Sequence, residues 1–384
     1  MTSIIADVLL VSPGAHIRPV CLELGDDGLI AAIHEGHHPP TGASVILDGG
    51  GELRLFPGFI DIHTHGANGA DLSQGTLEAV NTIAEAKLKE GVTTFLPTTW
   101  TASPEQTLAM ARAAAAYRAD PRFARVPGLH VEGPFLNPAQ AGAQDPATMR
   151  PPDLAEVLRI DHICPVLLLS LALEMPGARD LIADLAPREI VTSAAHSAAT
   201  YAEFQRARRA GLGHLTHFGN QMSPLHHREI GLVGAGLLDS GVLVEIICDG
   251  VHLSADMIQL VYRHIGCDRL MLITDSIAAA HLGDGTYPLH GTEIIVRDGA
   301  ARIPAGNLAG SIVTFDQALR NAAAITGLPL NELSKTSSGN QARSLRLKDR
   351  GEIKQGWLAD LTLLTPELSV VTTFVGGEMR YAAG

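Results

Sequence analysis

The segment Pro57-Gly-Phe-Ile-Asp-Ile-His-Thr-His-Gly66 combines the pattern of a buried β-strand with two potential metal ligands. Its apolar run, residues 59–65, ends in His63 and His65, which a single residue separates. Side chains two residues apart on a strand point to the same face, so both imidazoles can reach one metal ion. A His-x-His pair alone is weak evidence for a metal, because histidine is also an ordinary polar residue of protein cores. Ligands from elsewhere in the chain are needed to support a metal site.

Further apolar runs follow this one, and longer alanine-rich or amphipathic segments separate them. This alternation is typical of repeated βα units around a parallel sheet. The expected strands lie at 59–65, 93–98, 128–133, 165–172, 190–196, 214–220, 243–249 and 270–275. The expected helices lie at 76–90, 105–118, 153–159, 179–185, 201–210, 232–239 and 255–264, with an eighth beginning near Val313. We therefore expect residues 56–349 to form an α/β domain, a (β/α)8 TIM barrel.

The two ends of the chain follow a different pattern. Residues 1–55 and 350–384 contain short alternating strands, such as 3–11 and 361–364, with glycines between them and no helical period. We expect these ends to meet in one small β-domain. Residues 284–306 interrupt the barrel pattern, and their turn residues predict a β-hairpin.

Composition narrows the class of protein. Acidic residues outnumber basic residues, 41 to 28, and no basic run is interleaved with aromatic residues, so we expect no nucleic-acid groove. The four cysteines are far apart and lack the spacing of a structural zinc site. The longest apolar stretch, residues 163–173, is too short to span a membrane, and residues 1–7 lack the basic start of a signal peptide. We expect a cytoplasmic protein without membrane association.

Polar side chains stand at the carboxyl ends of several apolar runs. Besides His63 and His65, these are Glu132, His196, His217 and Asp275. A closed barrel brings such strand ends together, and burying each of them separately would be costly. Imidazole and carboxylate ligands without thiolate suit zinc or another borderline divalent metal. Six candidate ligands leave room for two metals about 3.5–4 Å apart, which would share the carboxylate of Glu132.

This centre predicts metal-dependent hydrolysis. A metal there would lower the pKa of bound water and make hydroxide available as the nucleophile. Hydrolysis of an amide also requires protonation of the departing amine. Asp275, at the end of the last strand, is the candidate general base and acid, although it is also a candidate metal ligand.

Five segments together carry a family resemblance. They are 57–66, His130-Val-Glu-Gly-Pro-Phe-Leu136, His214-Leu-Thr-His-Phe-Gly-Asn-Gln-Met222, Cys248-Asp-Gly-Val-His252 and Thr274-Asp275. With them the chain resembles the N-acetylglucosamine-6-phosphate deacetylases of the amidohydrolase superfamily, as far as the closing segment 356–361. The resemblance implies a (β/α)8 barrel with a small β-sandwich. It also implies cleavage of the acetamide of N-acetylglucosamine 6-phosphate into glucosamine 6-phosphate and acetate.

The resemblance also implies roles for individual residues. Glu132, His196 and His217 match the ligands shared across the family, and His63 and His65 match a pair that permits a second metal. Two metals per subunit are therefore expected, with zinc first and iron, manganese or cobalt as alternatives. Asp275 matches the general acid and base. The implied substrate contacts are Ala143, Gln144, Asn220, Gln221, Arg228, Asp249, His252, Leu308, Ala309 and Gly310.

Arg228 is the expected partner of the substrate phosphate, because a guanidinium can bind two phosphate oxygens at once. The alternative is an ordinary solvated charge on a loop. The resemblance implies a homodimer in which Arg228 and His252 reach the neighbouring subunit's site.

Other functions stay open at this point. Gln144 stands where some members have histidine, and Gln221 where a small residue is usual, so N-acetylgalactosamine 6-phosphate is an alternative substrate. Another amidohydrolase reaction, such as cyclic amide hydrolysis, would use the same metal site, but many such enzymes carry a bridging lysine that the third and fourth runs lack. A non-catalytic binding barrel would be expected to lack ligands or the proton carrier, and all six positions are intact here.

Overall fold

The computed structural model describes residues 3–289 and 292–384. Residues 1 and 2 of the N-terminal segment, and His290 and Gly291 of the expected hairpin, lie outside the described residues. Within the described part, no helix has both the length and the apolar character that crossing a membrane requires.

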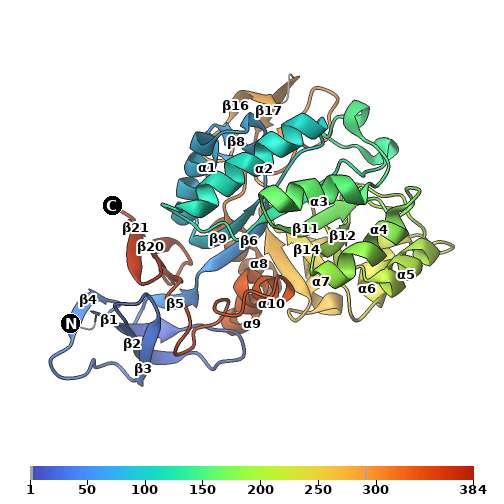
Figure 1. The fold of residues 1–384 in the computed structure, drawn as a ribbon. Coiled ribbons are helices and arrows are strands. Elements are labelled where there is room, and N and C mark those ends of the chain that lie inside the picture. Colours follow the sequence, from blue (N-terminus) through green and yellow to red (C-terminus); the bar gives the residue numbers. More distant parts are fainter. Residues whose placement is uncertain (1–2, 290–291) are drawn as a thin grey trace.

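A curled parallel sheet forms the larger part of the molecule (Figure 1). Its strands are β6 Phe59–Thr64, β9 Val92–Pro97, β10 Leu129–Glu132, β11 Val166–Leu171, β12 Val191–Ala194, β13 His214–Leu215, β14 Leu243–Ile247 and β15 Leu270–Ile273. Strands β10 to β15 pair in chain order, and β6 pairs with β9. Isolated parallel bridges join the two sets at both edges, Thr98 with His130 and Thr64 with Ser276.

Each of the strands predicted for the parallel sheet is present. The main difference between prediction and structure is the length of β13. The apolar pattern predicts a strand over 214–220, but the ladder ends at Leu215. The reason is a change of backbone conformation at His217, whose φ is 31°, which turns the chain out of the extended form.

Helices cover the outside of the sheet (Figure 1). They are α1 Leu77–Lys89, α2 Pro104–Ala119, α3 Leu154–Ile163, α4 Ala178–Leu185, α5 Tyr201–Ala210, α6 Gly231–Leu238, α7 Ala255–Ile265 and α8 Phe315–Thr326. Side-chain oxygens of Thr76, Ser103, Thr200 and Ser254 accept amide hydrogens at four helix starts, which fixes those boundaries. Two short helices that the pattern did not predict, α9 Leu330–Ser334 and α10 Asn340–Ser344, follow α8.

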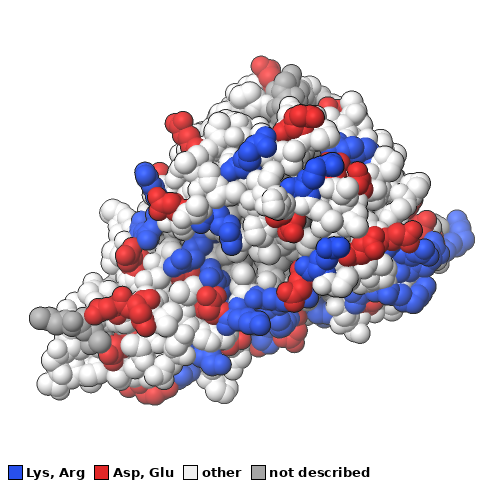
Figure 2. Space-filling model, viewed as in Figure 1, with Lys and Arg blue, Asp and Glu red and all other residues white. Residues whose placement is uncertain are grey.

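The helices present charge outward and apolar side chains inward. Figure 2 shows acidic and basic side chains interspersed over this face, with basic ones gathered near α5, whose last turn carries Arg208 and Arg209. On the inner side, a continuous apolar cluster fills the space between helices and sheet. Within it the rings of Phe59 and Phe315 stack with centroids 5.1 Å apart, joining β6 to α8. Burial of one such side chain contributes about 1.5–3 kcal/mol.

Strands from both chain ends form one branched sheet. They are β1 Ser3–Leu10, β2 Arg18–Leu24, β3 Ile30–Glu35, β4 Ser44–Asp48, β5 Arg54–Pro57, β19 Leu361–Leu364, β20 Val370–Val375 and β21 Glu378–Ala382. The order is β21-β20-β19-β5-β1-β2-β3, with β4 also paired to β1. Phe56 and Thr362 are partners where β5 meets β19, so the two ends meet in space as expected. The domain limits at 55/56 and 349/350 stay a prediction.

The inserted segment contains three strands rather than a two-stranded hairpin. They are β16 Gly285–Leu289, β17 Thr292–Arg297 and β18 Ala300–Arg302, and they pair antiparallel in that order. The third strand arises because the turn at Asp298-Gly299 folds the chain back on β17. Buried Ile294 and Val296 pack against Trp100 and Ile277, so this small sheet lies near the carboxyl end of β15.

A buried ion cluster lies beneath the strand that carries His63. The Nζ of Lys87, on α1, lies 3.2 Å from Asp61 Oδ2 and 3.0 Å from Glu90 Oε2, and it donates to Thr274 Oγ1 at 3.1 Å. Burial lowers the pKa of Lys87, but the charges of Glu90 and Asp61 outweigh it and raise that pKa. The lysine is therefore charged and links α1 to β6 and to the end of β15.

Replacing Lys87 with methionine is expected to lower the free energy of unfolding by about 3–5 kcal/mol, because two buried carboxylates lose their counter-charge. Urea denaturation followed by circular dichroism measures the change. Lys89→Met is the matched control: Lys89 is on the same helix and forms an exposed ion pair with Glu85, so its loss should cost under about 1 kcal/mol. Equal losses in both variants would contradict this role of Lys87.

Candidate active site

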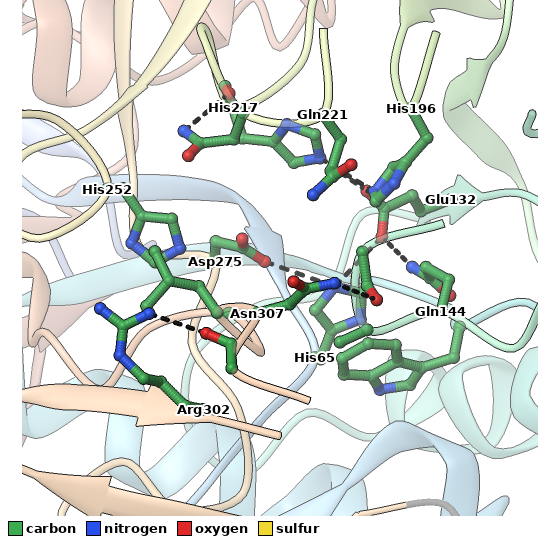
Figure 3. A pocket seen from close by; sticks show the side chains of 17 residues that line it. His65, Glu132, Gln144, His196, His217, Gln221, His252, Asp275, Arg302 and Asn307 are labelled. Carbon is green, nitrogen blue, oxygen red and sulfur yellow. Dashed lines mark hydrogen bonds and ion pairs between the residues drawn. The ribbon is translucent and has the colours of Figure 1, made fainter. Parts of the chain in front are cut away.

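The six predicted ligands converge at the carboxyl ends of the parallel strands (Figure 3). They form two groups: His63, His65 and Asp275, and Glu132, His196 and His217. In each group the candidate ligand atoms all lie within 4.8 Å of one another, and all six residues are buried. Strand ends that are distant in sequence thus supply two adjacent sets of nitrogen and oxygen donors.

Three of these residues have an unusual backbone. The φ angles of His196, His217 and Asp275 are 44°, 31° and 51°, in the left-handed region that residues other than glycine rarely adopt. Such strained backbone conformations persist only where the surrounding structure enforces them, and they are common at functional sites. Here each left-handed residue directs its side chain into the mouth of the sheet.

Glu132 lies between the two groups. Its Oε1 is 3.1 Å from His217 Nε2 and 3.4 Å from His196 Nε2. Its Oε2 is 3.3 Å from His65 Nε2. One carboxylate therefore faces nitrogen donors of both groups.

The hydrogen bonds of the imidazoles test whether a cation fits here. His65 Nδ1 lies 3.1 Å from the Thr98 carbonyl, and His196 Nδ1 lies 2.7 Å from the Gln140 carbonyl. A carbonyl only accepts, so each Nδ1 carries a hydrogen, and in the neutral form that binds a metal each ring has its lone pair on Nε2. Those lone pairs face carboxylate oxygens of Glu132, which also only accept. The buried Nε2 of His63 has no hydrogen-bond partner among residues 3–289 and 292–384. This donor set fits a divalent metal.

The buried charges favour a cation in the same place. Burial raises the pKa of Asp275, but the charges of His63 and His65 outweigh it and lower that pKa to about 2. Burial lowers the pKa of His65, but hydrogen bonds and charge from Asp275 and Glu132 raise it to about 9. The carboxylates are therefore ionised, and positive charge is stabilised beside them.

Glu245, on β14, orients ligands of both groups and was not identified from the sequence. Its Oε2 lies 3.2 Å from His63 Nδ1 and accepts from the backbone N–H of His217 at 3.4 Å. The side chain is fully buried. A carboxylate on Nδ1 fixes the orientation of the ring, which would turn Nε2 toward a bound metal and increase the basicity of that ligand. The detectable signal was an acid within the apolar run 243–249.

Trp100 and Gln144 hold other ligands in place. The Trp100 ring stacks on His65 with centroids 4.0 Å apart, and its Nε1 donates to Asp71 Oδ2 at 3.2 Å. Gln144 Nε2 donates to Glu132 Oε2 at 2.6 Å, while Gln144 Oε1 accepts from the N–H of Thr101 at 2.8 Å. Gln144, expected as a substrate contact, therefore also fixes a candidate metal ligand.

A cavity of about 330 Å³ opens beside the two ligand groups. The predicted substrate residues that line it are Ala143, Gln144, Asn220, Gln221, His252, Leu308 and Gly310. Trp100, Arg302 and Asn307 also line it and were not identified from the sequence. Two of these, Arg302 and Asn307, come from the inserted sheet and the chain that follows it, where the pattern predicted only a hairpin.

The other predicted substrate residues lie outside the cavity wall. Arg228 is exposed on a loop, with Nη1 2.7 Å from His227 Nε2, and its predicted role in a neighbouring subunit stays a prediction. Asp249 acts on His252: its Oδ1 accepts from the His252 N–H at 2.8 Å and its Oδ2 lies 2.6 Å from Nδ1. Ala309 is fully buried against the cluster around Trp100.

Replacing Glu245 with glutamine is expected to weaken metal binding about 10–100-fold, because His63 loses its charged partner while the side-chain shape is kept. Titration of metal-free protein with Zn²⁺ against a competing chelator gives the affinity. Glu85→Gln, at an exposed position of α1, is the control and should bind like the parent. Unchanged affinity in a folded Glu245→Gln protein would exclude the orienting role.

Known proteins are similar to this chain over most of its length. Residues 54–380 match the amidohydrolase family. The N-acetylglucosamine-6-phosphate deacetylase of Lysinibacillus sphaericus is 35% identical over 358 residues, covering 92% of each chain. The N-acetylgalactosamine-6-phosphate deacetylase of Escherichia coli O157:H7 is 35% identical over 358 residues, covering 92% of this chain and 93% of its own.

A solved structure agrees over nearly the whole length. It is that of a mutant N-acetyl-D-glucosamine-6-phosphate deacetylase from Mycobacterium smegmatis, in complex with N-acetyl-D-glucosamine-6-phosphate. The two chains are 32% identical, the TM-score is 0.92, and the match covers 99% of this chain and 100% of the other. With its strand order, its two ligand groups and these relatives, this chain belongs to the amidohydrolase family.

Proposed function

We propose that this protein hydrolyses the acetamide of N-acetylglucosamine 6-phosphate, releasing acetate and glucosamine 6-phosphate. The observation that carries the proposal is that the two ligand groups, one of which contains Asp275, lie together beside one cavity. The relatives named for this reaction match the chain over nearly its full length, which supports the same substrate class.

We infer that the curled sheet is a closed (β/α)8 barrel within residues 56–349, because parallel bridges join its two edges. The terminal strands, 1–55 and 350–384, then form the small β-sandwich domain.

Two divalent cations per subunit are proposed, with zinc expected first and iron, manganese or cobalt as alternatives. His63, His65 and Asp275 would hold one, and Glu132, His196 and His217 the other. When bound, such a cation polarises an amide carbonyl and lowers the pKa of bound water.

Asp275 is the proposed general base and acid. Its Oδ1 lies 3.3 Å from His63 Nε2 and 3.4 Å from His65 Nε2, and its side chain is 10% exposed, on the cavity side. Because its pKa is about 2, the carboxylate is ionised and can accept a proton from water. It then delivers that proton to the amine that leaves.

His252 is the proposed contact for a substrate oxygen. Asp249 holds it through both the backbone N–H and Nδ1, which leaves Nε2 for the cavity. We also propose a cytoplasmic homodimer in which Arg228 reaches the neighbouring site. His252, expected to reach that site as well, lines the cavity of its own chain instead, because Asp249 holds its ring there.

The epimer N-acetylgalactosamine 6-phosphate is the second candidate substrate. One relative is named for it, and Gln221 lines the cavity where the family pattern has a small residue. The side chain of Gln221 also lies close to the backbone of Gly142, so it narrows the cavity there.

Purified, metal-loaded protein is expected to release acetate from N-acetylglucosamine 6-phosphate with a kcat/KM at least about tenfold above that for the unphosphorylated sugar, since a hydrogen bond to a charged group contributes about 1.5–3 kcal/mol. Acetate release from the two sugar phosphates and from N-acetylglucosamine is measured in parallel. A faster reaction with the galacto epimer would favour the second substrate. No acetate from any of the three would contradict the proposed function.

Asp275→Asn is expected to reduce kcat about 10²–10⁴-fold, because the amide cannot carry the proton. The variant should retain much of the metal, because the amide oxygen can still serve as a ligand, and metal content measured on the same sample separates proton transfer from loss of metal. Asp256→Asn, at an exposed position of α7, is the control. Near-parental kcat in Asp275→Asn would exclude Asp275 as the proton carrier.

A further inference from the structure

A second cavity, of about 530 Å³, lies at the opposite end of the curled sheet from the candidate active site. Two contacts of its wall residues fix this position. Arg343 Nη2 donates to the carbonyl of Asp268, just before β15, at 2.7 Å, and Arg350 Nη1 donates to Thr94 Oγ1, near the start of β9, at 3.0 Å. The π-helical turn η5 Lys335–Gly339, which leads into α10, also lines the cavity. Such turns are rare and occur frequently at functional sites.

The wall of this cavity is basic, although the protein as a whole is acidic. It contains five cationic and two acidic residues, whereas the chain has 28 basic and 41 acidic residues. Figure 2 shows basic side chains over α10. Such a local reversal of charge attracts anions. The cationic residues are Lys335, Arg343, Arg346, Lys348 and Arg350, and the acidic residues are Asp268 and Glu352.

Two of the five cations have no carboxylate partner. Within residues 3–289 and 292–384, the side chain of Lys348 forms no ion pair or hydrogen bond, and Arg343 donates only to neutral oxygens. Both side chains are exposed. Each of the other three lies near a carboxylate; for example, Lys335 Nζ is 3.0 Å from Asp268 Oδ1. Arg343 and Lys348 are therefore the positive charges that remain for a ligand.

A buried amide holds Arg343 in place. The Nδ2 of Asn340, a residue that is 1% exposed, donates to the carbonyls of Cys267 and Leu270 at 2.6 and 2.7 Å. The Oδ1 of the same amide accepts from Arg343 Nη2 at 2.9 Å. With its bond to the Asp268 carbonyl, Nη2 is fully used, and the three N–H donors on Nη1 and Nε remain. Because the guanidinium is oriented before a ligand arrives, less entropy is lost on binding.

Close packing and one aromatic ring complete the wall. A Cβ at Gly351, whose φ is 92°, would lie 2.5 Å from the Cβ of Ala342, so the segment before β19 lies directly on α10. Ser338 Oγ donates to the Gly351 carbonyl at 3.1 Å and joins the two segments. Half-buried Trp357 adds an indole ring, and Lys354 Nζ lies 5.2 Å from its centroid. The cavity therefore has a rigid floor with an aromatic surface beside its cations.

We propose that this cavity binds a small molecule that carries phosphate groups, with Arg343 and Lys348 as its main partners. A guanidinium presents paired N–H donors to two phosphate oxygens, and an ammonium adds a point charge. None of the six candidate metal ligands lines this cavity. The bound molecule is therefore a ligand at a second site and not the substrate of the proposed hydrolysis.

Pyrophosphate and ADP are suitable probes, because both carry two phosphate groups and only ADP adds a planar base. Calorimetric titration of the metal-loaded protein gives the dissociation constants. Combining Arg343→Gln with Lys348→Gln is expected to raise the dissociation constant for pyrophosphate at least about tenfold, because two charged contacts are lost. Tighter binding of ADP that Trp357→Ala abolishes would identify a nucleotide as the ligand. Equal binding of the two probes would identify the phosphate groups alone as the recognised feature.

Arg209→Gln combined with Arg263→Gln is the matched control, since it removes two exposed cations from the outer helices α5 and α7. This control should bind pyrophosphate like the parent. Equal weakening in both double variants would show an effect of overall charge and overturn the proposal. Lys348→Glu provides a variant that does not disturb the contacts of Arg343. It should keep the circular dichroism of the parent and still bind pyrophosphate more weakly.

Pyrophosphate can also bind metal ions, so binding at the candidate active site has to be distinguished. Binding there would not depend on Arg343 or Lys348. Equal dissociation constants in the parent and in the Arg343→Gln, Lys348→Gln variant would therefore overturn the proposal. Failure of the parent to bind either probe at millimolar concentration would overturn it as well. Neither result depends on whether the protein releases acetate from a sugar phosphate.

Discussion

The carboxylate of Glu132 has imidazole nitrogens on both sides, and the arrangement of the site depends on this shared acceptor. Nε2 atoms of His65, His196 and His217 lie 3.1–3.4 Å from its oxygens. Because His65 and His196 use their Nδ1 hydrogens on backbone carbonyls, their neutral rings place Nε2 acceptors against the acceptor oxygens of Glu132. A cation between these acceptors removes the repulsion between their lone pairs. The surrounding residues hold the acceptors in place around this position.

Several features of the site lower the stability of the folded protein. Three ligands adopt left-handed backbone conformations, and six polar side chains are withdrawn from water. Buried polar contacts next to the site offset this loss of stability. The Lys87 cluster joins α1 to β6, and Glu245 links His63 to the backbone at His217. The strain at the site is thus supported by apolar packing and buried ion pairs a few ångströms away.

The sequence predicted the strands of the parallel sheet and most helices because their signal is local. A buried parallel strand such as 243–247 is a continuous apolar run, and a helix such as 201–210 begins with a capping residue, so neither needs knowledge of its neighbours. The short ladder at β13 and the third strand β18 depend on where the chain turns in space, and the pattern missed them.

The same distinction holds for the site. Ligands at strand ends were recognisable because a barrel gathers strand ends wherever they lie in the sequence. Glu245, Trp100 and Arg302 were missed, because their importance comes from which side chain they contact across the sheet. An isolated acid in an apolar run and an arginine in an inserted strand carry no such information by themselves.

The pairing of β5 with β19 has a consequence for biosynthesis. Strand β5 ends at Pro57 and runs almost directly into β6, whereas its partner begins at Leu361, about 300 residues later. At ribosomal rates of about 5–20 residues per second, β5 waits roughly 15–60 s for that partner. During this interval one edge of the terminal sheet is open to pairing with other chains. Closing that edge is therefore one of the last events in the maturation of each nascent polypeptide.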